Sequence, residues 1–103
     1  MIKLFEEYKR IKGETPKKGD YVKINFHSHN QPSFDDYINN SIGKIYDIDF
    51  KNYEIRVEYE KIPNNIKGFF YDNTSDFDIS CVAEYGKTIE ELELKLTANK
   101  YNL

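Results

Sequence analysis

The stretch that decides the fold is residues 42–60, Ile-Gly-Lys-Ile-Tyr-Asp-Ile-Asp-Phe-Lys-Asn-Tyr-Glu-Ile-Arg-Val-Glu-Tyr-Glu. In residues 53–59, apolar or aromatic side chains alternate with charged ones, the pattern of a strand with one buried and one wet face. Residues 42–50 are also rich in β-branched and aromatic side chains, and the polar segment 49–52 supplies a turn between the two runs. The stretch therefore predicts a β-hairpin.

The first strand of this hairpin has apolar residues in both phases of its alternation. Gly43 and Ile45 fall on one face of a regular strand, whereas Tyr46, Ile48 and Phe50 fall on the other. A flat strand cannot bury both sets on one side. Either both faces are covered, or a bulge near Tyr46 switches the phase and bends the strand.

Further strands are predicted on both sides of the hairpin. Alternation predicts one strand over residues 21–26 and another over residues 77–83, which places Phe77, Ile79 and Cys81 on one inward face. Residues 66–71, with three consecutive aromatic side chains, form either a helical turn or a short strand.

Helices are predicted at both ends of the chain and between the first two strands. The apolar spacing of residues 2–12 gives a three-turn helix, and Ser33 has capping-box spacing before a short helix over residues 34–39. Thr88 is a favourable N-cap for a last helix that runs to about Asn99. The apolar face of this last helix consists of Ile89, Leu92 and Leu96.

Length and composition predict one domain that spans residues 1–103, with a core built from a few aromatic rings, Ile and Val. Cys81 is the one cysteine, so no intrachain disulfide can form and nothing indicates an oxidising compartment. The first residues lack the apolar run of a signal peptide, and no apolar stretch approaches membrane-spanning length. We expect a cytoplasmic protein that does not bind a membrane.

Three segments follow one another in a recognisable order. In the first two, residues 18–24 (Lys-Gly-Asp-Tyr-Val-Lys-Ile) and 42–48 (Ile-Gly-Lys-Ile-Tyr-Asp-Ile), a glycine precedes a strand-like run of apolar and polar residues. The third, residues 53–59 (Tyr-Glu-Ile-Arg-Val-Glu-Tyr), alternates apolar and charged residues without a glycine. This order resembles the opening of SH3-like small barrels of the KOW and Tudor kind. The resemblance implies a module that binds proteins or nucleic acids and is not an enzyme. The whole chain is also similar to small proteins of phages and mobile elements in low-GC bacteria, several of which inhibit host defence.

The elements together predict an α+β fold, a small bent antiparallel sheet or SH3-like barrel of four or five strands with an amino-terminal and a carboxy-terminal helix.

Charge is unevenly distributed along the chain. Residues 26–86 hold eleven Asp and Glu against five Lys and Arg, a local charge of -6. Carboxylates along a sheet can complement a basic groove on a protein partner, with exposed tyrosines as anchors. We therefore predict a non-enzymatic protein-binding module, in the narrower form a phage-type inhibitor of a host defence protein, that needs no cofactor. The predicted partner-binding residues are Tyr46, Asp47, Asp49, Glu54, Glu58, Glu60, Tyr71 and Asp72, and Asp76 and Asp78 continue the acidic surface.

The alternative function is a nucleic-acid-binding accessory domain of the KOW type, which would use the basic amino-terminal part of the chain. Residues 1–25 hold seven Lys and Arg against four Asp and Glu. Tyr21 would be a stacking ring. The ordinary interpretation of these lysines is a solubilising surface. The basic residues concerned are Lys9, Arg10, Lys12, Lys17, Lys18 and Lys23.

Two kinds of chemistry are alternatives to binding. His27 and His29 could hold a metal ion with Asp35 or Asp36, although solvated loop histidines are the ordinary interpretation. Nucleophilic catalysis would need a base near Cys81, whose predicted inward face favours a small inert side chain. We predict neither a metal site nor an enzyme.

Overall fold

The computed structural model of the chain describes residues 15–28 and 30–101, so the helix expected over residues 2–12 lies outside the described residues. In chain order the elements are β1 (Tyr21–Ile24), α2 (Pro32–Asn39), β2 (Ile42–Asp49), β3 (Glu54–Glu58), the 3-10 helix η1 (Asn64–Phe69), β4 (Thr74–Asp78), the 3-10 helix η2 (Ile79–Cys81), β5 (Val82–Gly86) and α3 (Ile89–Tyr101).

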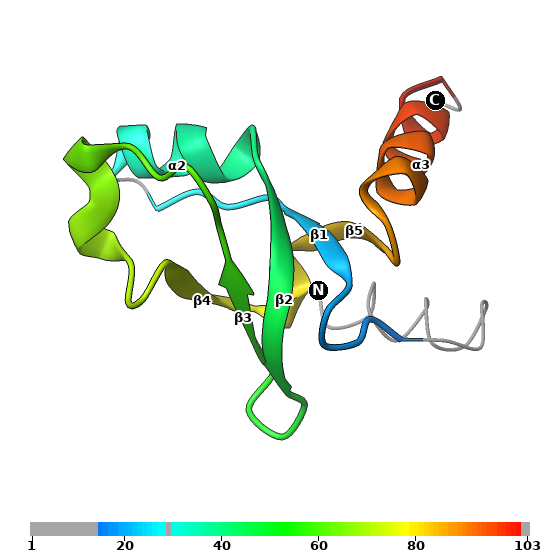
Figure 1. The fold of residues 1–103 in the computed structure, drawn as a ribbon, viewed down its shortest axis with the longest axis horizontal. Helices are drawn as coiled ribbons and strands as arrows, with labels where there is room; N and C mark the ends of the chain where they lie inside the picture. Colours follow the sequence, from blue (N-terminus) through cyan, green and yellow to red (C-terminus); the bar gives the residue numbers. More distant parts are fainter. Residues whose placement is uncertain (1–14, 29, 102–103) are drawn as a thin grey trace.

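The strands form one open antiparallel sheet in the order β4-β3-β2-β1-β5 (Figure 1). The predicted hairpin is the β2–β3 pair at its centre. β5 follows β4 directly in the chain but lies at the opposite edge of the sheet, where it pairs with β1. The predicted α+β fold with a small antiparallel sheet and a carboxy-terminal helix is confirmed.

Of the two alternatives for the apolar phases of residues 42–50, the structure has the bulge near Tyr46. The register between β2 and β3 shifts between Ile45 and Asp47, so that Tyr46 has no partner in the ladder and is 52% exposed. Gly43 and Ile45 are buried before the shift, and Ile48 packs against the same core after it. The bulge therefore keeps one face of the bent strand apolar.

The single strand predicted over residues 77–83 is wrong. The Asp78 carboxylate accepts a hydrogen bond from the Ser80 amide at 2.9 Å, which caps the 3-10 turn η2 and breaks the strand. Ile79 stays buried through this turn, so the apolar spacing continues while the chain changes direction. The turn allows Val82 to join the far edge of the sheet.

Two other local predictions are also wrong. Tyr53 was expected on the buried face of β3, but it is exposed, adopts a left-handed φ of 56° and precedes the strand. Ser33 does not cap α2, because the helix begins at Pro32, two residues earlier than expected, and the fixed φ of proline suits the first helical position.

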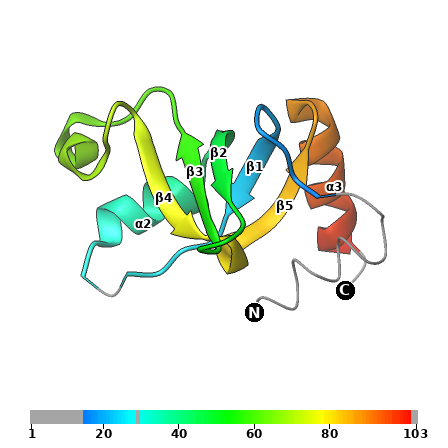
Figure 2. The ribbon, with the colours of Figure 1, turned by 90° about the horizontal axis from the view of Figure 1, so that it is seen from below.

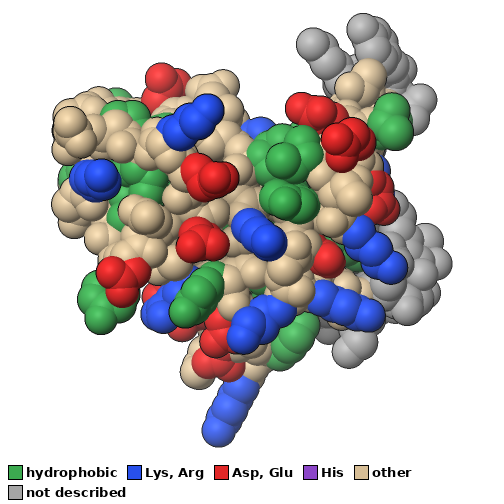
Figure 3. All heavy atoms as spheres, in the orientation of Figure 1, with side chains coloured by type: hydrophobic (Ala, Val, Ile, Leu, Met, Phe, Trp, Pro, Cys, Tyr) green, Lys and Arg blue, Asp and Glu red, His purple; other side chains and the backbone are tan. Residues whose placement is uncertain are grey.

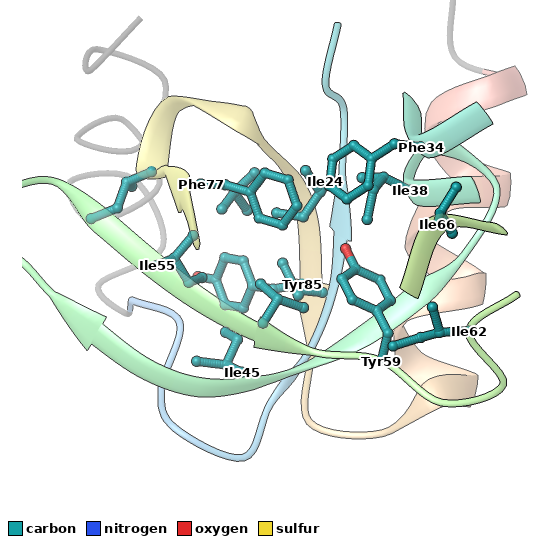
Figure 4. Close-up of a cluster of buried hydrophobic side chains, with 14 residues drawn as sticks. Ile24, Phe34, Ile38, Ile45, Ile55, Tyr59, Ile62, Ile66, Phe77 and Tyr85 are labelled. Atoms are coloured by element: carbon teal, nitrogen blue, oxygen red, sulfur yellow. The ribbon is translucent and has the colours of Figure 1, made fainter. Parts of the chain in front are cut away.

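One face of the sheet, the inner face, packs against α2 and η1 to form the hydrophobic core (Figure 4). The aromatic ring of Phe34 from α2 lies beside the rings of Phe26, Phe69, Phe70 and Phe77, at centroid distances of 5.5–6.4 Å. The buried side chains of this core are Val22, Ile24, Phe34, Ile38, Ile45, Ile55, Val57, Tyr59, Ile62, Ile66, Phe77, Ile79, Val82 and Tyr85.

The opposite, outer face is covered by α3 at its β5 end. Gly86 lies opposite Tyr21, and a Cβ atom at Gly86 would meet the backbone of Leu92 in α3 at 2.9 Å. The predicted cap is present, because Thr88 Oγ1 accepts from the Glu91 amide at 3.0 Å. Figure 2 shows α2 and α3 at opposite ends of the sheet. The outer face of β2, β3 and β4 is therefore left open by both helices.

Candidate protein-binding surface

The open part of the outer face carries two rows of charged side chains, each of which crosses β2, β3 and β4. The register places residues directly opposite one another, so the members of a row lie on the same face. The row nearer the hairpin tip is Asp49–Glu54–Asp78, and the next is Asp47–Arg56–Asp76. We call the five carboxylates of these rows, Asp47, Asp49, Glu54, Asp76 and Asp78, the acidic face.

Arg56 is the one cation in the two rows. Its Nε and Nη2 atoms donate to the two carboxylate oxygens of Asp76 at 2.8 and 3.1 Å. The hydrogen bond from Arg56 lowers the pKa of Asp76, and the same interaction raises the pKa of Arg56. Five carboxylates thus surround one guanidinium group that is already paired with one of them.

The outermost row holds three carboxylates opposite one another. Hydrogen bonds from Asn52 lower the pKa of Asp49, and the backbone hydrogen bond from Ser80 lowers the pKa of Asp78. The Asn52 Nδ2 atom donates to Asp49 at 2.7 Å, which also fixes the orientation of that carboxylate. Two of the three groups are therefore held in place and ionised, with Glu54 between them.

Glu58 and Glu60 do not belong to the acidic face. Glu58 lies opposite Lys44, and both glutamates line a hollow of about 630 Å³ together with Lys44 and Lys61. Tyr21 and Ile89 also line this hollow, and Ile89, expected on the buried face of the last helix, is exposed there. Acidic and basic side chains are balanced at this end of β3, so the acidic face does not extend to Glu58 and Glu60.

The predicted tyrosine anchors lie on either side of the acidic face. Tyr46 is exposed at the bulge, next to Asp47. Tyr71 is 75% exposed and lines a groove of about 390 Å³ with Arg56 and Asp76. Asp72 follows in a turn with a φ of 49° and is exposed away from the two rows.

The sequence indicated Asp76 and Asp78 only as a continuation of the acidic surface beyond the hairpin. The structure gives them a direct place in it, because the β3–β4 register sets them opposite Arg56 and Glu54. In Figure 3, acidic side chains (red) lie along the hairpin end of the sheet, with Lys and Arg side chains (blue) beside them.

Three of the basic residues proposed for nucleic-acid binding lie in the described part of the chain, and their surroundings differ. Lys23 Nζ donates to the main-chain oxygen of Asn39 at the end of α2, and burial lowers the pKa of this lysine. Lys17 and Lys18 are exposed before β1. Lys9, Arg10 and Lys12 lie outside the described residues.

Metal and thiol chemistry find little support in the geometry. His29 lies outside the described residues, and among the residues that are described no group of three or more His, Cys, Asp or Glu side chains could hold a metal ion. Cys81 is half-buried, and burial raises the pKa of its thiol, which disfavours the reactive thiolate.

None of the helices in the described part of the chain is long and apolar enough to span a membrane.

Comparison with protein-family models, with curated proteins and with solved structures gives no match to this chain.

Proposed function

We propose that this chain is a non-enzymatic protein-binding module that uses the acidic face to engage a basic surface on a partner protein. The observation that carries the proposal is the row Asp49–Glu54–Asp78, in which three carboxylates lie directly opposite one another across three strands. Like charges in this arrangement destabilise a sheet. Lysine or arginine side chains of a partner would relieve that repulsion.

The arrangement favours rapid and oriented binding. Carboxylates on neighbouring strands are held by the sheet, so little conformational freedom is lost when a partner docks. Complementary charge raises the association rate and fixes orientation more than it adds affinity. Tyr46, exposed beside Asp47, supplies an aromatic side chain of the kind that contributes most energy in interfaces.

Two resemblances support narrower forms of this proposal. The return of β5 to pair with β1 in a small bent sheet supports an SH3-like core, a fold that generally binds proteins or nucleic acids. The similarity to small phage proteins supports an inhibitor, whose binding would lower the activity of a host defence protein.

The test compares two variants that remove the same charge. D49N/E54Q/D78N neutralises the outer row, whereas E60Q/E90Q/E93Q neutralises three exposed carboxylates elsewhere. The tagged chain captures proteins from a lysate of its source organism, and each captured protein is purified and titrated against all three forms by calorimetry at low and high salt.

We expect the outer-row variant to lose about tenfold or more in affinity and most of the salt dependence, and the control variant to bind like the parent chain. Equal loss in both variants, or binding that does not change in either, contradicts the proposal. Substitution of Lys17 and Lys18 by Gln tests the nucleic-acid alternative, which predicts that only this change weakens salt-sensitive binding of single-stranded DNA or RNA.

A further inference from the structure

The main chain of β4 offers hydrogen-bonding groups at the edge of the sheet. The Tyr59 amide donates to Asn73 O and the Ile79 amide donates to Tyr53 O, both at 2.9 Å. In an antiparallel pair, bonded and non-bonded residue pairs alternate. These two bonds therefore fix which residues of β4 turn their main chain towards β3.

By this alternation, Ser75 and Phe77 direct their N–H and C=O groups towards β3. Thr74 and Asp76 direct theirs away from it. Thr74 uses both groups in a reciprocal pair with Tyr71, at 2.9 Å in each direction. After Thr74, Asp76 is the next residue of β4 whose main-chain N–H and C=O groups point away from β3.

A groove lies beside this edge. It has a volume of about 390 Å³ and is lined by residues 68–71, by residues 74–76 and by Arg56. The chain reaches Tyr71 from η1, and the bridge between Tyr71 and Thr74 is isolated. Among the described residues, no strand pairs with β4 beside Asp76, and the groove runs along this position. Phe69 and Tyr71, both exposed, stand at its rim.

We propose that this edge groove binds an extended segment of the partner protein, which adds to β4 as a sixth, antiparallel strand and exchanges main-chain hydrogen bonds with Asp76. The inference rests on the proposed function and specifies how the basic partner would be held. Strand addition gives affinity through main-chain bonds and specificity through alternate side chains.

The carboxylates of β4 define the sequence that such a strand must have. Side chains directly opposite Asp76 and Asp78 would lie on the outer face, next to the acidic rows. Asp76 is shared with Arg56, whereas Asp78 has no ion-pair partner among the described residues. The matching strand therefore carries Lys or Arg at two positions separated by one residue, and that residue is apolar.

The same carboxylates argue against a second copy of the chain as the occupant. Antiparallel pairing of two β4 strands would bring Asp76 and Asp78 of each copy close to those of the other. Repulsion between like charges across strands disfavours this pairing, as charged side chains do on many natural edge strands. Charge at this edge therefore disfavours pairing with β4 of a second copy and favours pairing with a basic strand.

The experiment uses the full chain, labelled with ¹⁵N, and a synthetic peptide of four lysines alternating with three valines. Two further peptides have the same charge: one is N-methylated on the two inner lysines and the other on two of the valines. In a strand whose lysines lie opposite Asp76 and Asp78, the lysine amides face β4 and the valine amides face away. Methylation of the lysines therefore removes the pairing donors without any change of charge.

We expect the parent peptide to slow hydrogen exchange of the Asp76 amide at least about tenfold at saturation. Methylation on lysine should weaken binding about tenfold or more, as the loss of one or two hydrogen bonds does, and methylation on valine should have little effect. The Ser75 and Phe77 amides, which already face β3, should change little.

Failure of this inference is distinguishable from failure of the proposed function. If the two methylated peptides bind alike and exchange at Asp76 does not change, or if the parent peptide does not bind, strand addition is wrong. Binding that is weakened by salt and by D49N/E54Q/D78N, without protection of Asp76, would leave the acidic face as the docking surface. The proposed function is tested separately, by capture of the partner and calorimetry with the parent chain, the outer-row variant and the control variant.

Discussion

The ring of Tyr59 lies against the backbone of Gly43, where an added Cβ atom would come within 2.9 Å of Tyr59 Cε1 and would overlap Val57 Cγ1. We predict that Gly43→Ala lowers the free energy of unfolding by about 1–3 kcal/mol, because the core must shift to admit a methyl group. Urea denaturation measures the change. Gly68→Ala is the matched control, since nothing lies within 4 Å of its Cβ position, and a similar loss there would contradict this explanation.

The hydroxyl group of Tyr59 is buried and has no hydrogen-bond partner among the described residues, and Figure 4 shows it pointing inward towards the layer of Phe34 and Ile38. Removal of an unsatisfied buried polar group removes its desolvation cost. We predict that Tyr59→Phe raises the free energy of unfolding at pH 7 by about 1 kcal/mol, measured by urea denaturation. A loss of similar size would show that the hydroxyl has a partner, such as a buried water molecule.

The same residue gives a pH dependence. Burial raises the pKa of Tyr59 well above its ordinary value of about 10. Above about pH 10 the unfolded chain releases this proton, whereas the folded state keeps it. The free energy of unfolding is therefore unaffected by this group below about pH 10 and falls as the pH rises further. Between pH 9 and pH 11 the parent chain should lose more unfolding free energy than Tyr59→Phe. Parallel losses in the two proteins would contradict the burial of this hydroxyl.

The ion pair between Arg56 and Asp76 should affect the pKa of Asp76 more clearly than the free energy of unfolding. We predict that Arg56→Gln raises the pKa of Asp76 towards its ordinary value, as followed by ¹³C NMR of the carboxyl group. The pKa of Asp78 should change much less, because that pKa is lowered mainly by the backbone hydrogen bond from Ser80 and not by Arg56.

The linkage for Asp76 has the opposite sign to that of Tyr59. Its lowered pKa contributes stability above the ordinary carboxyl range, and this contribution is lost as the pH falls through the folded-state value. Both side chains are nearly half exposed, so we expect the substitution to cost less than about 1 kcal/mol at pH 7. A larger loss would mean that the pair holds β3 and β4 together.

Lys95 holds α3 to the edge of the sheet. Its Nζ atom donates to Tyr85 O at 2.9 Å and lies 4.9 Å from the centroid of the Tyr85 ring. We predict that Lys95→Met lowers the free energy of unfolding by about 1–2 kcal/mol, since the charged hydrogen bond and the cation–π contact are both lost. Lys67→Met, at an exposed lysine of η1, should be neutral, and an equal loss there would point to a general effect of charge.

The sequence was most informative where structure depends on neighbours in the chain. Alternation over residues 53–59 predicted β3 to within one residue at each end. The conflict of phase around Tyr46 reduced the possibilities to two covered faces or a bulge, and the structure has the bulge. Thr88 capped α3 as expected because a capping bond spans only three residues.

The break at η2 could not be predicted from hydrophobic alternation. Ile79 remains buried through the turn, so the apolar pattern reads as an uninterrupted strand. The local signal was Asp78 followed two residues later by Ser80, the spacing of the capping bond that starts the turn. That the next strand joins β1 is a tertiary property, set by pairing across most of the chain.

The acidic face was only partly predictable, because its composition depends on pairing between strands. Charge along the hairpin indicated Asp47, Asp49 and Glu54, but the register with β4 decides which carboxylates meet. Glu58 looked equivalent to Glu54 in the alternation. It differs because β2 places Lys44 opposite it, and no property of β3 alone could show this.

The passage of the chain from β4 to β5 also bears on how the protein folds. β1 gains its second neighbour only when residues 82–86 reach it, although residues 21–24 come early in the chain. The hairpin of β2 and β3 can close locally, whereas this last pairing requires closure of a very long loop. High contact order of this kind slows folding, so the late joining of β5 to β1 is the step expected to limit the rate at which the native sheet is completed.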